Sequence, residues 1–227
     1  MRSSCKAIQI ATLLLFTQAA ISGVMGDEAL SDYPYNGLYG GINIGVSDLI
    51  DKETTSGPSA SHQLSATGII GGGLVGYDYT LYDRLKLGVE GFVNATALNL
   101  AARDFSPPAS YLVNSHVNAG VRLLPGWEIT TNAIAHLILG YTNASITIQD
   151  NGNYGYIDQS FNKSGFQAGL GFKTALTEHI WLRADALYAT YGTINAIGGN
   201  SNPSYAYQNY SNNLSTLEGD LTLVYKF

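Results

Sequence analysis

The chain has 227 residues, a formal net charge of −6 and only 12% charged residues. Ordinary soluble domains carry about 25% charged residues, so the composition argues against a soluble enzyme. An acidic chain also argues against a nucleic-acid partner, which needs clustered Lys and Arg. The 26 Gly and 16 Tyr suit a single sheet with one face toward lipid and the other toward a crowded or wet interior.

The first 26 residues have the organisation of a secretory signal peptide. Arg2 and Lys6 form a basic beginning, and residues 7–20 form a mostly apolar run. This run is too short for a membrane helix, which needs about 20 apolar residues, and has the length of a signal core. We therefore predict that residues 1–26 are removed during export.

The expected cleavage site follows Gly26, because Val24 and Gly26 place small residues at the positions that signal peptidase reads. Cleavage after Ser22 is the alternative. Cys5 lies before the apolar run, so the exported chain would contain no cysteine and form no disulfide in an oxidising compartment. Residues 27–36 are then expected to be a short periplasmic segment.

The remainder of the chain alternates between apolar and polar residues with the period of two that is typical of strands. Along residues 85–95, Leu85, Leu87, Val89, Val93 and Ala95 share one face, and Lys86, Gly88, Glu90 and Asn94 share the other. Each predicted strand exceeds the roughly 9–11 residues of a tilted membrane crossing. The eight predicted strands are 37–48, 65–79, 85–98, 111–123, 129–145, 163–176, 180–192 and 214–227.

The connections between these strands alternate in length. Long, polar loops are predicted at 49–64, 99–110, 146–162 and 193–213, and tight turns at 80–84, 124–128 and 177–179. Outer-membrane barrels have this asymmetry, with short periplasmic turns and long external loops. A lipocalin is the main alternative, but it would carry more charge on the face that is apolar here. Residues 37–227 are thus predicted to form an all-β, membrane-spanning, antiparallel up-and-down barrel of about eight strands.

Aromatic residues lie near the predicted strand ends, where two belts would mark the two lipid–water interfaces. The belt on the side of the short turns would contain Tyr79, Tyr82, Trp127, Trp181, Tyr225 and Phe227. The belt on the side of the loops would contain Tyr111, Tyr141, Tyr188 and Tyr191.

Two stretches resemble a known family. The aromatic, glycine-rich first strand (YNGLYGGINIG, residues 35–45) and the end LVYKF (residues 223–227) look like the small eight-stranded outer-membrane barrels, which include OmpA transmembrane domains and Opa-like and OmpX-like proteins. The resemblance implies a place in the Gram-negative outer membrane, contact with its lipid and lipopolysaccharide, and recognition of Tyr225 and Phe227 by the barrel assembly machinery.

Charged residues on the inward face are the candidate site. They are expected to pair or to be hydrated, because an isolated charge away from water is costly. One interpretation is a packed lumen, and the other is a narrow, gated ion path. The predicted network contains Lys86, Glu90, Arg122, Lys173, Arg183, Asp185, Glu218 and Asp220, and Lys226 shares their face.

No catalytic, cofactor or metal residues are predicted. His116 and His136 are both placed on the inner face, and Ser115 would point away from His116, so no Ser–His pair is expected. The main functional prediction is a structural barrel or narrow porin-like channel. The alternative is a surface adhesin or interaction protein whose loops bind host or surface ligands, for which the Tyr-, Ser- and Asn-rich residues 200–213 are suited.

Overall fold

A computed structural model describes residues 35–55, 61–82, 84–105, 108–152, 155–197 and 209–227. The predicted signal peptide, its cleavage site and most of residues 27–36 lie outside this set and stay predictions. The described chain forms eight strands: β1 (Gly37–Thr55), β2 (Ser61–Tyr82), β3 (Leu85–Phe105), β4 (Pro108–Thr130), β5 (Ala133–Gly152), β6 (Gly155–Ala175), β7 (Ile180–Ile197) and β8 (Asn209–Lys226). No helix of the described residues is long and apolar enough to cross a membrane.

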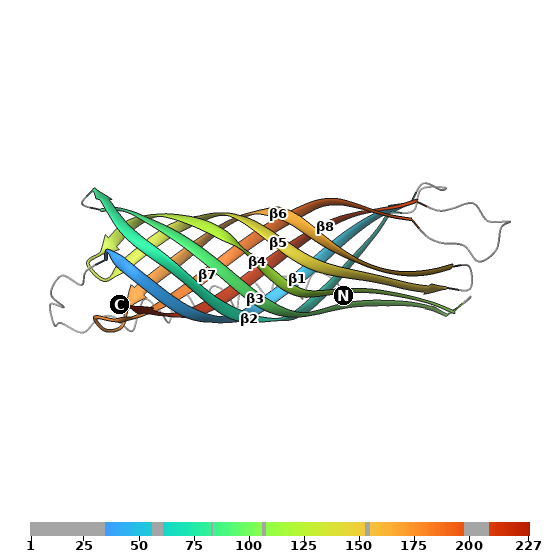
Figure 1. Cartoon of the computed structure of the whole chain (residues 1–227), viewed down its shortest axis with the longest axis horizontal. Coiled ribbons are helices and arrows are strands. Elements are labelled where there is room, and N and C mark those ends of the chain that lie inside the picture. Colours follow the sequence, from blue (N-terminus) through green and yellow to red (C-terminus); the bar gives the residue numbers. More distant parts are fainter. Residues whose placement is uncertain (1–34, 56–60, 83, 106–107, 153–154, 198–208) are drawn as a thin grey trace. The chain divides into compact units, whose positions relative to one another are not determined.

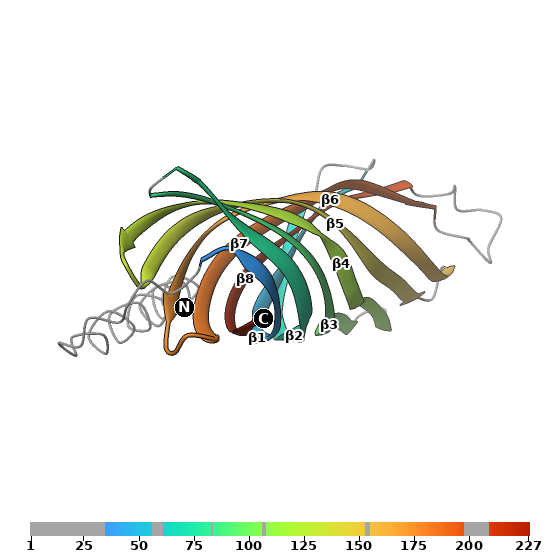
Figure 2. The same cartoon turned by 60° about the vertical axis from the view of Figure 1, so that its left-hand side comes forward.

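The eight strands close into one barrel in sequence order (Figures 1 and 2). Every neighbouring pair is antiparallel, and β1 closes the barrel by pairing with β8, for example Gly45 with Asp220. Closure leaves no sheet edge. A sheet in a membrane must be closed, because unpaired backbone N–H and C=O groups find no hydrogen-bond partner in lipid. The predicted eight-stranded, antiparallel all-β barrel is confirmed.

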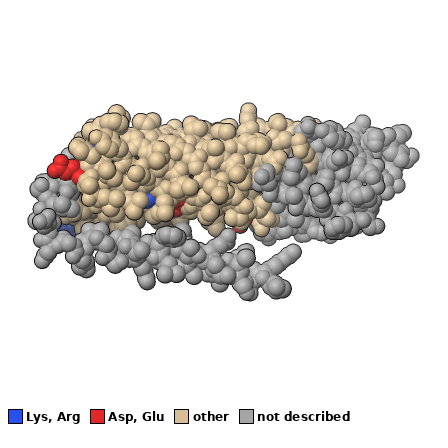
Figure 3. All heavy atoms as spheres, turned by 90° about the horizontal axis from the view of Figure 1, so that it is seen from below, with Lys and Arg blue, Asp and Glu red and all other residues tan. Residues whose placement is uncertain are grey.

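The alternation along each strand sorts side chains to the two faces. Val89 is 51% exposed, whereas its neighbour Glu90 is 1% exposed. The outer face carries many exposed large apolar side chains, including Ile42, Ile44, Ile69, Val75, Val93, Val121, Leu139, Leu170 and Leu221. Figure 3 shows almost no charged residues on the described part of one side of this surface. An apolar outer band of this kind is suited to lipid.

The strands are longer than predicted at the end opposite the tight turns. The predicted loops at 49–64, 99–110, 146–162 and 193–213 contain antiparallel pairing in their described parts. Within these ranges, residues 56–60, 106–107, 153–154 and 198–208 lie outside the described set. The sequence prediction was wrong here because polar composition was interpreted as loop. Outside lipid, both faces of a hairpin can be polar while the backbone still pairs.

The turn predicted at 124–128 is also misplaced. Pro125 and Gly126 lie within β4, where they pair with Leu87 and Lys86 of β3. The chain turns at Thr131 and Asn132 instead. Pro–Gly is a general turn signal, but here the pairing with β3 continues through it. The other two tight turns lie close to their predicted positions.

Candidate functional site

The charged side chains of the inner face meet in the middle of the barrel around Glu90 of β3. Arg183 of β7 contacts this carboxylate with Nη1 at 2.5 Å from Oε2 and with Nη2 at 3.2 Å from Oε1. Arg122 of β4 lies 3.6 Å from Oε1, and the Tyr39 hydroxyl donates to Oε2 at 3.1 Å. Glu90, Arg122 and Arg183 are each at most 2% exposed. The two guanidinium groups therefore compensate the buried carboxylate of Glu90 in place of water.

Asp185 of β7 extends this cluster toward β5. Arg183 Nε lies 2.8 Å from Asp185 Oδ2, which is an ion pair rather than an aligned hydrogen bond. His136 Nε2 lies 3.1 Å from Asp185 Oδ1. Arg122 Nε donates to Gln167 at 3.0 Å, and its guanidinium carbon lies 3.8 Å from the centre of the Phe92 ring. Four strands thus contribute ionisable side chains to one buried group.

A second cluster lies at the end of the barrel that carries the tight turns. Asp78 of β2 accepts from Lys173 at 2.5 Å and pairs with Lys226 at 3.0 Å. Lys86 pairs with Glu128 at 2.9 Å. By the usual orientation of such barrels this is the periplasmic end.

Tyr35 caps this second cluster. The ammonium groups of Lys86, Lys173 and Lys226 lie 5.2, 5.0 and 4.4 Å from the centre of its ring. Its edge packs against Trp181 at 6.4 Å between ring centres, and its carbonyl accepts from Lys226. At 8% exposure, Tyr35 fills the lumen mouth rather than lying free before β1.

Toward the long hairpins the inner face becomes apolar. Seven buried residues from five strands form one cluster, and Ala66 and Phe161 pack against it. Each of the seven is at most 5% exposed. The cluster contains Leu49, Leu98, Ala144, Ile146, Ala189, Tyr191 and Leu214. The lumen is therefore filled by an aromatic and lysine layer, a charged layer and an apolar layer in succession.

All eight predicted network residues are buried. The structure brings Glu90, Arg122, Arg183 and Asp185 together, and places Lys86 and Lys173 with Lys226 in the second cluster. Glu218 and Asp220 form no ion pair within the described chain. Sequence reasoning missed Asp78, which alternates with outward Tyr77 and Tyr79, and that alternation was the signal that could have identified it.

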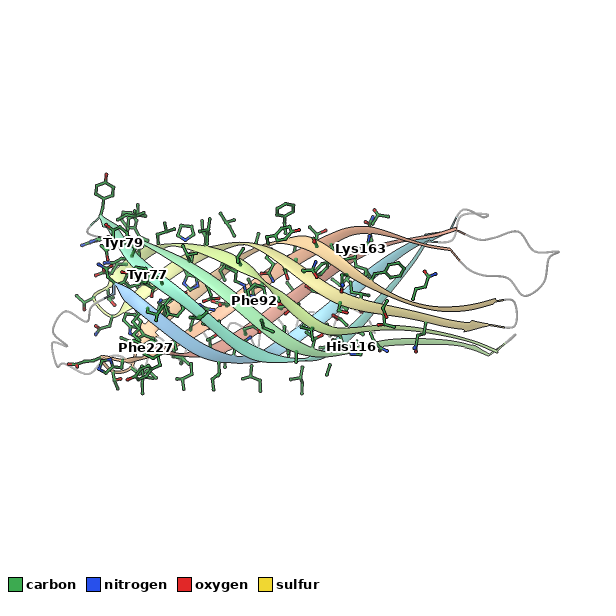
Figure 4. The ribbon with its side chains drawn as sticks, in the orientation of Figure 1. Tyr77, Tyr79, Phe92, His116, Lys163 and Phe227 are labelled. Carbon is green, nitrogen blue, oxygen red and sulfur yellow. The ribbon has the colours of Figure 1, made fainter. Side chains whose placement is uncertain are left out.

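The placement of His116 was wrong. A register irregularity between Ser115 and Val117 reverses the alternation in β4, so His116 is exposed and Ser115 is buried. Figure 4 shows His116 and Lys163 toward the hairpin end, and Tyr77, Tyr79 and Phe227 at the other. His136 does face inward, and it pairs with Asp185 rather than with a serine. Among the described residues, no group of three or more His, Cys, Asp or Glu could hold a metal.

The aromatic belts are largely as predicted, with two corrections. Tyr79, Tyr82, Trp127, Tyr225 and Phe227 are exposed at the turn end, and Tyr141 and Tyr188 are exposed nearer the hairpins. Trp181 and Tyr191, however, are 1% and 5% exposed. Both share the odd-numbered face of β7 with Arg183, so they point into the lumen. The side chain of Tyr111 is outside the described set.

The predicted assembly signal lies on the outer surface. Tyr225 and Phe227 are 49% and 75% exposed, and their rings meet edge to face at 5.3 Å. Both are accessible at the β1–β8 seam, where the barrel closes. Their recognition by the assembly machinery stays a prediction.

A closed barrel with an apolar outer band, aromatic rims and a charged interior defines the class of outer-membrane β-barrel proteins. The sequence matches the family described as outer membrane protein beta-barrel domain over residues 10–227. The chain belongs to this family, and its place is the bacterial outer membrane. No curated protein matches the chain.

Among solved structures, the chain is similar to Neisserial surface protein A, at 14% identity, covering 82% of this chain and 97% of that one, with a TM-score of 0.45. It is also similar to OprG of Pseudomonas aeruginosa, at 12% identity, 85% and 97% coverage and a TM-score of 0.47. A third similar structure is the outer membrane protease OmpT of Escherichia coli, at 11% identity. The match covers 89% of this chain and 100% of that one, with a TM-score of 0.49. Likeness at this level carries no argument about activity.

Proposed function

We propose that the protein is a sealed outer-membrane scaffold rather than an open channel in its resting state. The observation that carries the proposal is the filled lumen, with Tyr35 and Trp181 at one end, the Glu90 cluster in the middle and the apolar cluster around Leu49 beyond it. An eight-stranded barrel is only wide enough for its own side chains. The paired charges in the middle of the lumen and the apolar cluster beyond them both oppose the passage of hydrated ions.

Conductance of the full mature chain in planar bilayers tests this. The wild type should be nearly silent. Arg183→Ala leaves Glu90 and Asp185 with weaker partners and opens space beside them, which favours water entry. That variant should raise the open fraction or the conductance, whereas Arg84→Ala, which changes an exposed cation in the turn before β3, should not. A large conductance in the wild type would contradict the sealed lumen.

A second role is favoured by the length of the hairpins. Strands of 18–23 residues exceed the roughly 9–11 needed for a crossing. The excess lies at the end away from the tight turns, where exposed side chains pair with polar partners, as Asn143 does with Ser164 and Thr147 with Ser160. We propose that these hairpins present a surface that binds lipopolysaccharide or host ligands.

Whole-cell binding would test the hairpin proposal. Variants with each hairpin shortened by one or more register pairs should assemble normally but differ in binding to host-cell surfaces or extracellular matrix. Retention of all binding in every shortened variant would restrict the protein to a structural role. Enzymatic activity is not part of either proposal.

A further inference from the structure

Two carboxylates in the lumen lack a counter-charge. Asp78, Glu90, Glu128 and Asp185 each lie within 4.0 Å of a Lys, Arg or His nitrogen. Glu218 and Asp220 of β8 are 3% and 4% exposed, and among the described residues neither lies within that distance of a basic group. Glu218 Oε1 accepts from Thr216 at 3.2 Å, while Glu218 Oε2 and both Asp220 oxygens have no hydrogen-bond partner.

Asp220 is directed toward β1. Its register partner on β7 is Asp185, a second carboxylate, which disfavours an orientation toward β7. Its register partner on β1 is Gly45, and a Cβ added to Gly45 would overlap Asp220 Oδ1. The carboxylate therefore lies over Gly45, in space that any other residue would fill. Glycine is required here by the close approach of the carboxylate.

Further oxygens surround this position. Asn43 and Ser47 flank Gly45 on the inner face of β1, and Ser47 lies directly opposite Glu218. A Cβ on Gly72, the β2 partner of Asn43, would overlap Asn94 Oδ1, so that amide also leans toward this part of the lumen. The oxygens of Asn43 and Asn94 are buried and have no hydrogen-bond partner, and Asn94 Nδ2 is unpaired as well. The buried Ser47 hydroxyl interacts with Glu218 without forming a hydrogen bond of good geometry.

This collection consists mainly of acceptors. Ordered water would satisfy individual oxygens, but water supplies no counter-charge for two buried carboxylates. Arg122 acts electrostatically on both carboxylates. It is already paired with Glu90 and bonded to Gln167, and its one free nitrogen, Nη2, does not contact them. The space around Glu218 and Asp220 is therefore suited to a positively charged ion that binds oxygen ligands.

We infer that Glu218 and Asp220 hold a hard divalent cation, with Asn43, Ser47 and Asn94 supplying neutral oxygens. The chemistry fits Ca²⁺, which takes six to eight carboxylate, amide and water oxygens in flexible geometry. Mg²⁺ fits less well, because it requires a near-octahedral shell and keeps its waters. The ion neutralises the two carboxylates and connects β8 to β1 across the seam that closes the barrel.

Metal content tests this inference. The full mature chain is refolded with CaCl₂ or with EDTA, free metal is removed by gel filtration, and retained calcium is measured by mass spectrometry. The wild type refolded with CaCl₂ should retain about one Ca²⁺ per barrel, because a filled lumen slows its escape. Glu218→Gln and Asp220→Asn, which keep shape but remove charge, should weaken binding by at least the roughly 10–100-fold that loss of a supporting residue costs.

Asp48→Asn is the matched control, because Asp48 lies on the outer face of β1, where Thr67 donates to it at 3.2 Å. It should retain calcium like the wild type. Calcium should also raise the urea midpoint of the wild type and Asp48→Asn but not of the two lumen variants. If the wild type retains no ion, the carboxylates are protonated or paired through Arg122, and the inference is overturned whether or not the variants fold. Equal retention by Glu218→Gln and Asp220→Asn would equally overturn it.

Discussion

At the scale of single residues, stability depends on which side of the sheet a side chain occupies. Neighbours along one strand have opposite environments, as Val89 in the outer band and Glu90 in the lumen show. Apolar side chains on the outer face are stabilised by lipid, whereas a charge on the inner face is costly unless a partner or a bound ion compensates it. Two substitutions test these two requirements separately.

Val89→Arg should destabilise the barrel by about 2–4 kcal/mol, because a cation near the middle of the lipid face is poorly solvated. Val89→Leu keeps the face apolar and should change the free energy of unfolding little. Urea unfolding in lipid vesicles measures both. If Val89→Arg were neutral, the assignment of faces in β3 would be wrong by one residue.

Arg183→Met should cost about 3–5 kcal/mol, since it leaves the buried Glu90 and Asp185 with fewer partners while keeping a side chain of similar length. Arg84→Met, which removes an exposed cation in the turn before β3, should change the free energy by less than about 1 kcal/mol. The same unfolding assay in vesicles compares them. Equal, small effects would mean that the lumen carboxylates are already compensated by water or ions.

At the scale of elements, each strand has a part in lipid and a part beyond it. At one end of the barrel the strands are joined by the tight turns. At the other end the strands stay paired beyond the apolar band, and exposed polar pairs such as Thr193 with Asn213 take the place of apolar side chains on the outer face. Bulges adjust this continuation, and the one at Ser115–Val117 exchanges the faces of β4. The outer parts are expected to contribute little to the stability of the barrel.

Replacing residues 150–157 by Asn-Gly shortens the β5–β6 hairpin and supplies a turn that matches the twist of the strands. The Gln149–Asp158 pair then closes the hairpin. The barrel should assemble, and its urea midpoint should stay near that of the wild type. A matched replacement at the other end, of Thr131 and Asn132 by two prolines, should abolish assembly, because it breaks the turn between β4 and β5. Loss of assembly in the shortened hairpin would show that its outer part is needed for folding.

At the scale of the whole molecule, closure makes the barrel cooperative. Every strand has two paired neighbours, and β1 and β8 join residues that are far apart in sequence. Opening the barrel in a membrane exposes a row of unpaired backbone groups to lipid, so partly opened states are costly. Closed barrels of this kind are expected to resist detergent without heating.

The mature chain should therefore run on SDS gels at different positions before and after boiling. Unboiled protein keeps its barrel and migrates as a compact species, whereas boiled protein migrates as an unfolded chain. The comparison is made on protein extracted from outer membranes. Identical migration, or recovery of the mature chain in the soluble periplasmic fraction, would contradict the assignment to the membrane.

The sequence by itself determined the architecture, because a period of two with an apolar face depends only on local alternation. It also placed Glu90, Arg122, Arg183 and Asp185 inside. It misjudged the hairpins and the turn after β4, because polar composition does not distinguish loops from strands beyond the membrane.

Tertiary structure alone decided which inward charges meet. Contacts such as Arg183 with Glu90, and the lack of one at Asp220, depend on strand stagger and on bulges such as the one that turned His116 outward. Alternation gives each residue a face, but not its height in the barrel. Only closure of the sheet brings residues of distant strands to the same level, where a charge either finds a partner or remains without one.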